Sequence, residues 1–247
     1  RPGKALTAYN LGALLALRGD YREAYAWLME ARETFAAMGH VPHLFRTLRD
    51  LVQWAWALGD LETAARWMQE VEALASSLPR AAWIEDLRLE HAVHAMELQG
   101  GSPPTALLRW LERVSPDAPV HQLLRAVRVC ESTGQHDRAR AYLDMALRRA
   151  RQEGWLSWIS VWLARLERSE DSRELVWGGR RLLLEARKRD WLSLEWKARY
   201  ILHRARRTGQ TRHALRVALE RQLQHIPPSH RERFVHRVHR STRGMLS

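Results

Sequence analysis

The apolar residues near the start of the chain follow the spacing of two helices that meet at Gly19-Asp20. They recur every three or four positions, as residues on one face of a helix do. Before the pair they are Leu11, Leu14 or Leu15 and Ala16, and after it Tyr21, Ala24, Leu28 and Ala31. Glycine readily adopts the left-handed conformation that ends a helix, and Asp20 with Glu23 three residues later is typical of a capping box. The pattern therefore predicts a helical hairpin.

The same hinge recurs along the chain. Gly59-Asp60 lies 40 residues after Gly19, and Gly134 follows Gly100 by 34 residues, whereas the fifth unit lacks a hinge glycine. Repeats of this length indicate stacked hairpins that bury their apolar faces against one another. We expect one all-α domain over residues 1–247, an α-solenoid of about six hairpins with a terminal helix that caps the array. The expected units are about 5–38, 44–77, 83–114, 120–152, 154–188 and 190–225, with the capping helix at 229–243. Without that helix, the sixth hairpin should fray more than the first.

Composition supports a folded chain and suggests its compartment. The hydrophobic fraction is 46%, enough for a sizeable core, and no apolar run reaches the length of about 18 residues that a membrane span needs. Cys130 is the only cysteine, which excludes an internal disulfide and fits a reducing compartment such as the cytoplasm. Because the sequence starts without methionine, we interpret it as a piece of a longer polypeptide.

No catalytic or metal-binding constellation is evident. Most of the 12 tryptophans lie at helical spacing to Leu or Ala, which favours core packing over a ligand cage. Three pairs of histidines three residues apart lack a third and fourth ligand. The paired glycines are not followed by the Lys-Ser/Thr of a phosphate-binding loop. We therefore expect no enzyme activity, no cofactor and no metal.

Three of the units carry residues that resemble tetratricopeptide (TPR) repeats. They are Asn10-Leu11-Gly12, Gly19-Asp20-Tyr21, Ala24, Leu28 and Ala31 in the first unit, Gly59-Asp60-Leu61 and Ala64 in the second, and Gly134, Ala139 and Ala146 in the fourth. The units depart from the family by exceeding its usual period in most cases and by lacking its terminal proline. Such longer, looser repeats are similar to those of large bacterial signalling proteins. The resemblance implies a right-handed superhelix that serves as an interaction scaffold or regulatory part.

The resemblance also implies which surface binds. First helices of TPR hairpins line a concave groove, and the matching positions here are Tyr9, Asn10, Arg46, Arg49, Gln53, Arg88, His121, Arg125, Arg128 and Arg199. Guanidinium groups bind carboxylates bidentately, so we expect an acidic peptide or a partner domain, including one of the same longer chain. The alternative is that these arginines are solvated or paired with neighbours such as Asp50 and Glu90.

A second functional hypothesis rests on charge. The formal net charge is +12, yet only three of the 40 basic residues are Lys, an arginine bias typical of a GC-rich bacterial genome. Residues 199–243 hold twelve arginines against two glutamates, so most of the excess lies there. This segment could neutralise phosphates of a nucleic acid. The residues proposed for that alternative are Arg231, Arg233, Arg237, Arg240 and Arg243.

Overall fold

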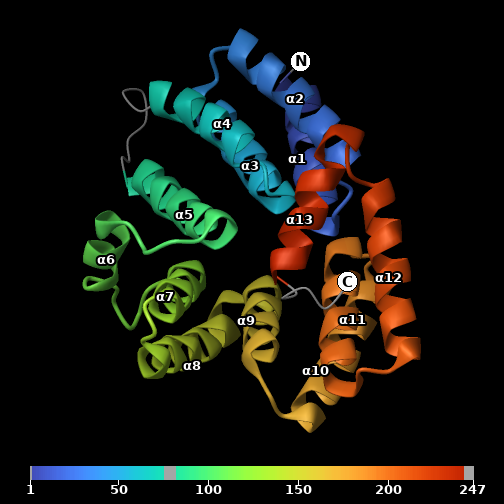
Figure 1. Cartoon of the computed structure of the whole chain (residues 1–247). Helices are drawn as coiled ribbons and strands as arrows, with labels where there is room; N and C mark the ends of the chain where they lie inside the picture. Colours follow the sequence, from blue (N-terminus) through green and yellow to red (C-terminus); the bar gives the residue numbers. More distant parts are fainter. Residues whose placement is uncertain (1, 75–81, 242–247) are drawn as a thin grey trace.

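A computed structural model describes residues 2–74 and 82–241, and within those ranges the regular structure is helical throughout. The helices are α1 (Pro2–Arg18), α2 (Tyr21–Ala37), α3 (Val41–Leu58), α4 (Leu61–Ala73), α5 (Ala82–Gln99), α6 (Thr105–Leu111), α7 (Val120–Ser132), α8 (His136–Glu153), α9 (Trp155–Arg168), α10 (Ser172–Lys188), α11 (Leu192–Arg206), α12 (Gly209–Gln224) and α13 (Arg231–Ser241), with a short 3-10 turn, η2 (Pro228–His230), before the last. Consecutive helices pair into six hairpins, and each hairpin packs against the next (Figure 1). The predicted all-α solenoid is confirmed.

The hinges form for local reasons that the sequence reveals. Gly19 and Gly59 have φ values of +99° and +77°, the left-handed region that glycine enters without strain. Asp60 begins α4 as an N-cap, since its carboxylate accepts hydrogen bonds from the Thr63 backbone N–H at 3.1 Å and from the Thr63 hydroxyl at 2.8 Å.

Asp20 corrects the prediction of a capping box in the first hairpin. It occupies the N-cap position of α2, but its side chain makes no capping hydrogen bond. Instead it pairs with Arg18 Nη2 at 3.0 Å and with the imidazole of His225. Two potentially cationic groups hold a carboxylate more strongly than a neutral N–H does, so the side chain turns away from the helix start.

The two ends of the solenoid meet, so that the hairpins form a closed ring (Figure 1). The backbone N–H of Arg22 donates to the carbonyl of His225 at 2.9 Å, and Gln222 Nε2 donates to the carbonyl of Gly19 at 2.8 Å. Arg18 also pairs with Asp190 at 2.9 Å. A Cβ added to Gly19 would lie 2.9 Å from Gln222 Oε1, so the closure also depends on that glycine.

The last helix, α13, has a wider role than the predicted cap. It runs inside the ring, where it packs on α3 and where Phe234 meets the ring of Trp196 on α11 at 6.3 Å (Figure 1). Arg233 and His230 pair with Asp60, and Arg237 Nη1 donates to the carbonyl of Trp56 at 2.6 Å. The helix therefore braces the second hairpin against the sixth.

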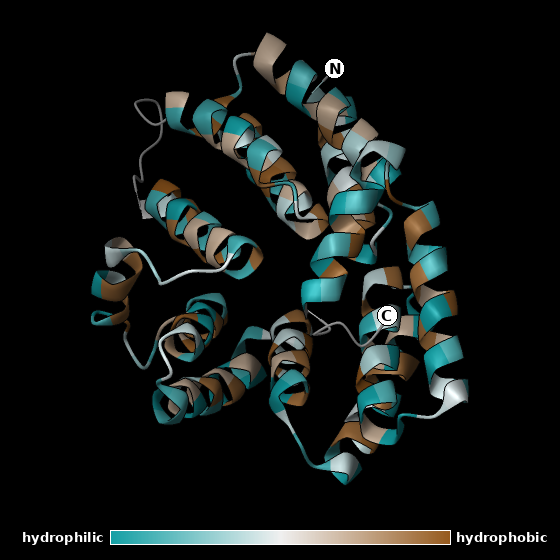
Figure 2. Cartoon of the chain, in the orientation of Figure 1, coloured by the Kyte–Doolittle hydropathy of each residue, from teal (hydrophilic) through white to brown (hydrophobic). Residues whose placement is uncertain are grey.

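The hydrophobic core follows this closure. Each helix carries alternating hydrophilic and hydrophobic stripes (Figure 2), and the apolar stripes pack into clusters. One cluster joins Leu28 and Leu51 of the first two hairpins to Trp196, Ile226 and Phe234 from the other end of the chain. Of the tryptophans predicted to pack in the core, two are buried, Trp54 and Trp56. Half-buried are Trp27, Trp67, Trp110, Trp158 and Trp162.

Candidate functional site

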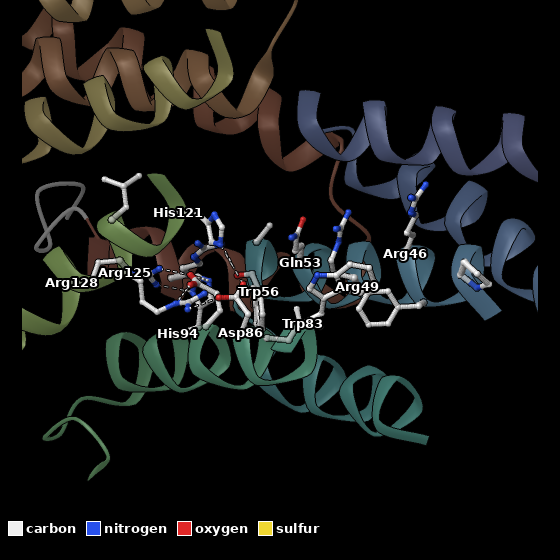
Figure 3. A pocket seen from close by; sticks show the side chains of 17 residues that line it. Arg46, Arg49, Gln53, Trp56, Trp83, Asp86, His94, His121, Arg125 and Arg128 are labelled. Carbon is white, nitrogen blue, oxygen red and sulfur yellow. Dashed lines mark hydrogen bonds and ion pairs between the residues drawn. The ribbon is translucent and has the colours of Figure 1, made fainter. Parts of the chain in front are cut away.

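A cavity of about 870 Å³ lies between α3, α5, α7 and α13 and is called the α3–α5 cavity below. The predicted groove residues that line it are Arg46, Arg49 and Gln53 from α3 and His121, Arg125 and Arg128 from α7. Figure 3 shows the three α3 side chains in a row at one end of the cavity and the α7 side chains clustered with those of α5 at the other. Six of the ten predicted residues therefore share one cavity.

The other four predicted groove residues do not line it. Asn10 is exposed on α1, and Arg88 pairs with Glu72 at 2.8 Å. Arg199 pairs with Glu195 at 2.9 Å within α11. Tyr9 hydrogen-bonds Asp50, and burial together with the Asp50 charge raises the pKa of its hydroxyl. Three of these four residues therefore have partners outside the α3–α5 cavity, and the predicted groove is only partly formed.

The α3 wall of the cavity is cationic. Arg46, Arg49 and Gln53 are three and four residues apart, which places them on one helix face. Arg49 is paired with Asp50 at 3.1 Å, whereas Arg46 has no ion-pair partner in the part of the chain that the structure describes. Burial raises the pKa of Asp50, and the Arg49 charge opposes that shift. This wall therefore retains positive charge that is not neutralised.

The α5–α7 wall is an ion-pair network. Arg125, with only 1% of its side chain exposed, donates to Glu90 at 2.7 Å and to Asp86 at 2.8 Å. Arg128 donates to Glu90 and Glu97, each at 2.5 Å. Burial alone would raise the pKa of Glu90, but the two guanidinium groups outweigh it and hold that pKa below its usual value. The charges of this wall are satisfied within the protein.

The network shows what the sequence reasoning missed. Arg49 pairs with Asp50 and Arg125 pairs with Glu90, the two carboxylates that the alternative interpretation of the groove gave as possible partners of these arginines. Asp86, Glu90 and Glu97 were not among the predicted site residues. Their spacing of four and seven residues places them along one face of α5. Arg125 and Arg128 lie on the first helix of the following hairpin. The acidic stripe on α5 together with these two arginines was the sequence signal that predicts the network.

His94 lies half-buried beside this network as a neutral ring. Its Nδ1 lies 3.3 Å from Arg128 Nη2, which can only donate, so Nδ1 is the acceptor and the ring proton resides on Nε2. The ring also packs against Trp56 at 4.9 Å. Burial, followed by the nearby charge of Arg128, holds the pKa of His94 well below 6.5. Protonation would remove the acceptor and place two cations together.

We expect His94 to make the protein sensitive to mild acid. Below pH 6.5 the unfolded chain protonates this histidine while the folded protein does not, so the free energy of unfolding falls as the pH drops from 6.5 toward the lowered pKa. Other histidines with a lowered pKa, such as His91, act in the same direction. Denaturant titrations of His94→Asn, which keeps an acceptor but cannot be protonated, should show a shallower slope by up to about 1.4 kcal/mol per pH unit. The exposed His236→Asn is the control, and equal slopes for His94→Asn and the unchanged protein would contradict the prediction.

The arginines of the nucleic-acid alternative do not share one free surface. Arg231 is exposed, Arg233 is paired with Asp60, and Arg237 lies inside the ring. Arg240 lines a second interior cavity, and Arg243 lies outside the described residues.

Three further observations concern metal ligands, membrane spans and the cysteine. In residues 2–74 and 82–241, no three His, Cys, Asp or Glu side chains are grouped so as to hold a metal ion. Over the same residues, no helix has the length and apolar composition of a membrane span. Cys130 is fully buried, and burial raises the pKa of its thiol.

Comparison with known proteins agrees with the hairpin architecture. A family model described as tetratricopeptide repeat matches residues 4–77, the segment that holds the first two hairpins. Neither a curated protein nor a solved structure matches the chain. The predicted resemblance is confirmed for this segment, and the chain is a TPR-like helical solenoid. Tetratricopeptide repeats are non-catalytic and generally mediate protein–protein interactions.

Proposed function

We propose that the protein is an interaction module that binds an acidic segment of a partner protein in the α3–α5 cavity. The observation that supports this most directly is the α3 wall, where Arg46 lines the cavity without an ion-pair partner among the described residues. Its neighbour Arg49 shares only the carboxylate of Asp50, so its remaining N–H donors are open to a ligand. A carboxylate placed there would gain charge-assisted hydrogen bonds.

Aromatic side chains lie at the same end of the cavity. Phe45 and Trp83 stack at 5.5 Å, with an angle of 25° between their rings, and Trp83 is 43% exposed (Figure 3). An exposed indole favours apolar contact with one end of a ligand. The expected ligand is therefore an acidic segment that also carries an apolar or aromatic residue. By the resemblance to the looser repeats of bacterial signalling proteins, we propose a regulatory role within such a protein in the cytoplasm.

The experiment compares two labelled peptides that differ only in charge, one with alternating Glu and Trp and one with Gln in place of Glu. The unchanged protein should bind the Glu peptide at least about tenfold more tightly, a difference of about 1.4 kcal/mol. The Arg46→Glu/Arg49→Glu variant should lose that preference while keeping its helix content. Arg125 is unsuitable for this test because it is buried in the ion-pair network.

A matched control reverses two arginines elsewhere. Arg140 and Arg148 are exposed on α8 and line neither interior cavity, so Arg140→Glu/Arg148→Glu changes the net charge equally. The control should retain the preference for the Glu peptide. If both double variants lose it to the same degree, long-range attraction rather than the α3 wall binds the peptide, and the proposal fails.

A further inference from the structure

A second cavity of about 630 Å³ lies inside the ring between α7, α9, α11 and α13, and is called the α11–α13 cavity. It adjoins the α3–α5 cavity, because Arg128 and Arg237 line both. Its basic lining residues are Arg128, Arg168, Lys197, Arg237 and Arg240, and its acidic ones are Glu97 and Glu167. The cavity is thus lined by an excess of positive charge.

Ion pairs within the protein account for only part of that charge. Arg128 is paired with Glu97, and Arg168 is paired with Glu131 through contacts of 2.5 and 2.8 Å. Among the described residues, Lys197, Arg237 and Arg240 have no ion-pair partner.

Arg237 has only one hydrogen bond, which Nη1 donates to the carbonyl of Trp56 at 2.6 Å. Its other N–H groups have no acceptor among the described residues. Together with Lys197 it can supply several donors to a single ligand.

The charged forms of Lys197 and Arg237 are both destabilised inside the cavity. Burial lowers the pKa of Lys197, Glu167 offsets this in part, and the charge of Arg237 lowers it again. Burial lowers the pKa of Arg237 as well, partly offset by Tyr21 and Glu97, and Arg128 lowers it further. Cations removed from water without a counter-ion are unfavourable, and a bound anion would relieve both the desolvation and the repulsion.

We propose that the α11–α13 cavity binds a small phosphate-bearing molecule, with its phosphate held by Lys197 and Arg237 and with Arg240 adding positive charge. Three cations that line one cavity suit a compact multivalent anion, whereas Arg46 and Arg49 follow one another along a single helix. The volume lies in the range of small-molecule sites. Trp196 and Phe234 also line the cavity and provide an apolar wall for the rest of the ligand. Arg237 lines both cavities, whereas Lys197 and Arg240 line only this one and Arg46 and Arg49 line only the other, so variants can test the two sites separately.

The test measures thermal unfolding with inorganic pyrophosphate against sodium chloride of equal ionic strength. Pyrophosphate should raise the midpoint progressively with concentration, as a ligand that binds only the folded state does. Lys197→Met removes a partly buried cation without an ion-pair partner among the described residues, so the ligand-free variant should be at least as stable as the unchanged protein. Its affinity for pyrophosphate should nevertheless fall at least about tenfold, the effect of losing about 1.4 kcal/mol of binding. Lys188→Met, at an exposed lysine on α10, should change neither quantity.

A second variant keeps the test decisive if Lys197→Met does not fold. Arg240 is exposed at the cavity, so Arg240→Gln should leave the fold intact and weaken pyrophosphate binding severalfold. The proposal is overturned if pyrophosphate stabilises no more than sodium chloride does, or if Lys188→Met loses the response as fully as Lys197→Met. It is also overturned if Lys197→Met weakens the response to the Glu peptide but leaves the response to pyrophosphate unchanged.

Discussion

Replacing Arg125 with methionine should lower the free energy of unfolding by about 3–5 kcal/mol, the range expected when one partner of a buried ion pair is removed. The variant fills much of the same volume but leaves the carboxylates of Asp86 and Glu90 without the donors at 2.8 and 2.7 Å that now neutralise them. Arg128 still pairs with Glu90, so the loss should be concentrated at Asp86, which keeps only the imidazole of His121 at 3.4 Å. Denaturant unfolding measures the change.

Arg140→Met is the control for this substitution. The Arg140 side chain is 82% exposed and lies 3.8 Å from a fully exposed Asp137, so its loss should change stability by no more than about 0.5 kcal/mol. The pH dependence of stability provides a second test of Arg125→Met. If the network stabilises the fold, acid that protonates Asp86 and Glu90 should reduce the difference in the free energy of unfolding between the variant and the unchanged protein. A loss below about 1 kcal/mol at neutral pH would show that the network contributes little.

The arginines on the two walls of the α3–α5 cavity have different roles, one in stability and the other in the proposed binding. Arg125 and Arg128 share carboxylates with α5, so their charge holds hairpins together. Arg46 and Arg49 look the same in sequence, yet they face the cavity with at most one neutralising carboxylate. Counting arginines along first helices therefore overstates the charge that a ligand can use.

Local features of the fold could be predicted from the sequence because they depend on residues close in the chain. Apolar spacing fixes each hairpin within about 40 residues, glycine hinges mark several of them, and Gly59 and Gly134 have the expected positive φ. Six of the predicted groove positions also came together, because stacking hairpins in order aligns their first helices.

The closure of the ring could not be predicted in this way. It joins Gly19 to Gln222 and Trp56 to Arg237, which lie 203 and 181 residues apart. Whether two ends meet depends on small rotations added over every hairpin, and no single residue encodes that sum. Asp20 shows how closure can override a local prediction. Its sequence neighbours predict an N-cap, but its carboxylate pairs with His225 from the other end of the chain.

Shortening Phe234 to alanine should destabilise the protein by about 3–5 kcal/mol, because a phenylalanine in a packed core is replaced by a cavity. Phe234 is 4% exposed on α13 and belongs to the core cluster that unites both ends of the chain. The neighbouring Val235→Ala is the matched control on the same helix, since Val235 is 37% exposed and should contribute within about 0.5 kcal/mol.

Hydrogen exchange on Phe234→Ala distinguishes a brace from a cap. A helix that only caps the sixth hairpin would, when loosened, release the amides of α11 and α12 and leave the second hairpin protected. Because α13 packs on α3, pairs with Asp60 and donates to the carbonyl of Trp56, the structure instead predicts that α3 loses protection together with α11. The amides of α7 and α8 should be least affected, since the contacts of α13 named above lie on the second and sixth hairpins. Protection lost from α11 and α12 alone would show that the ring closes without the help of α13.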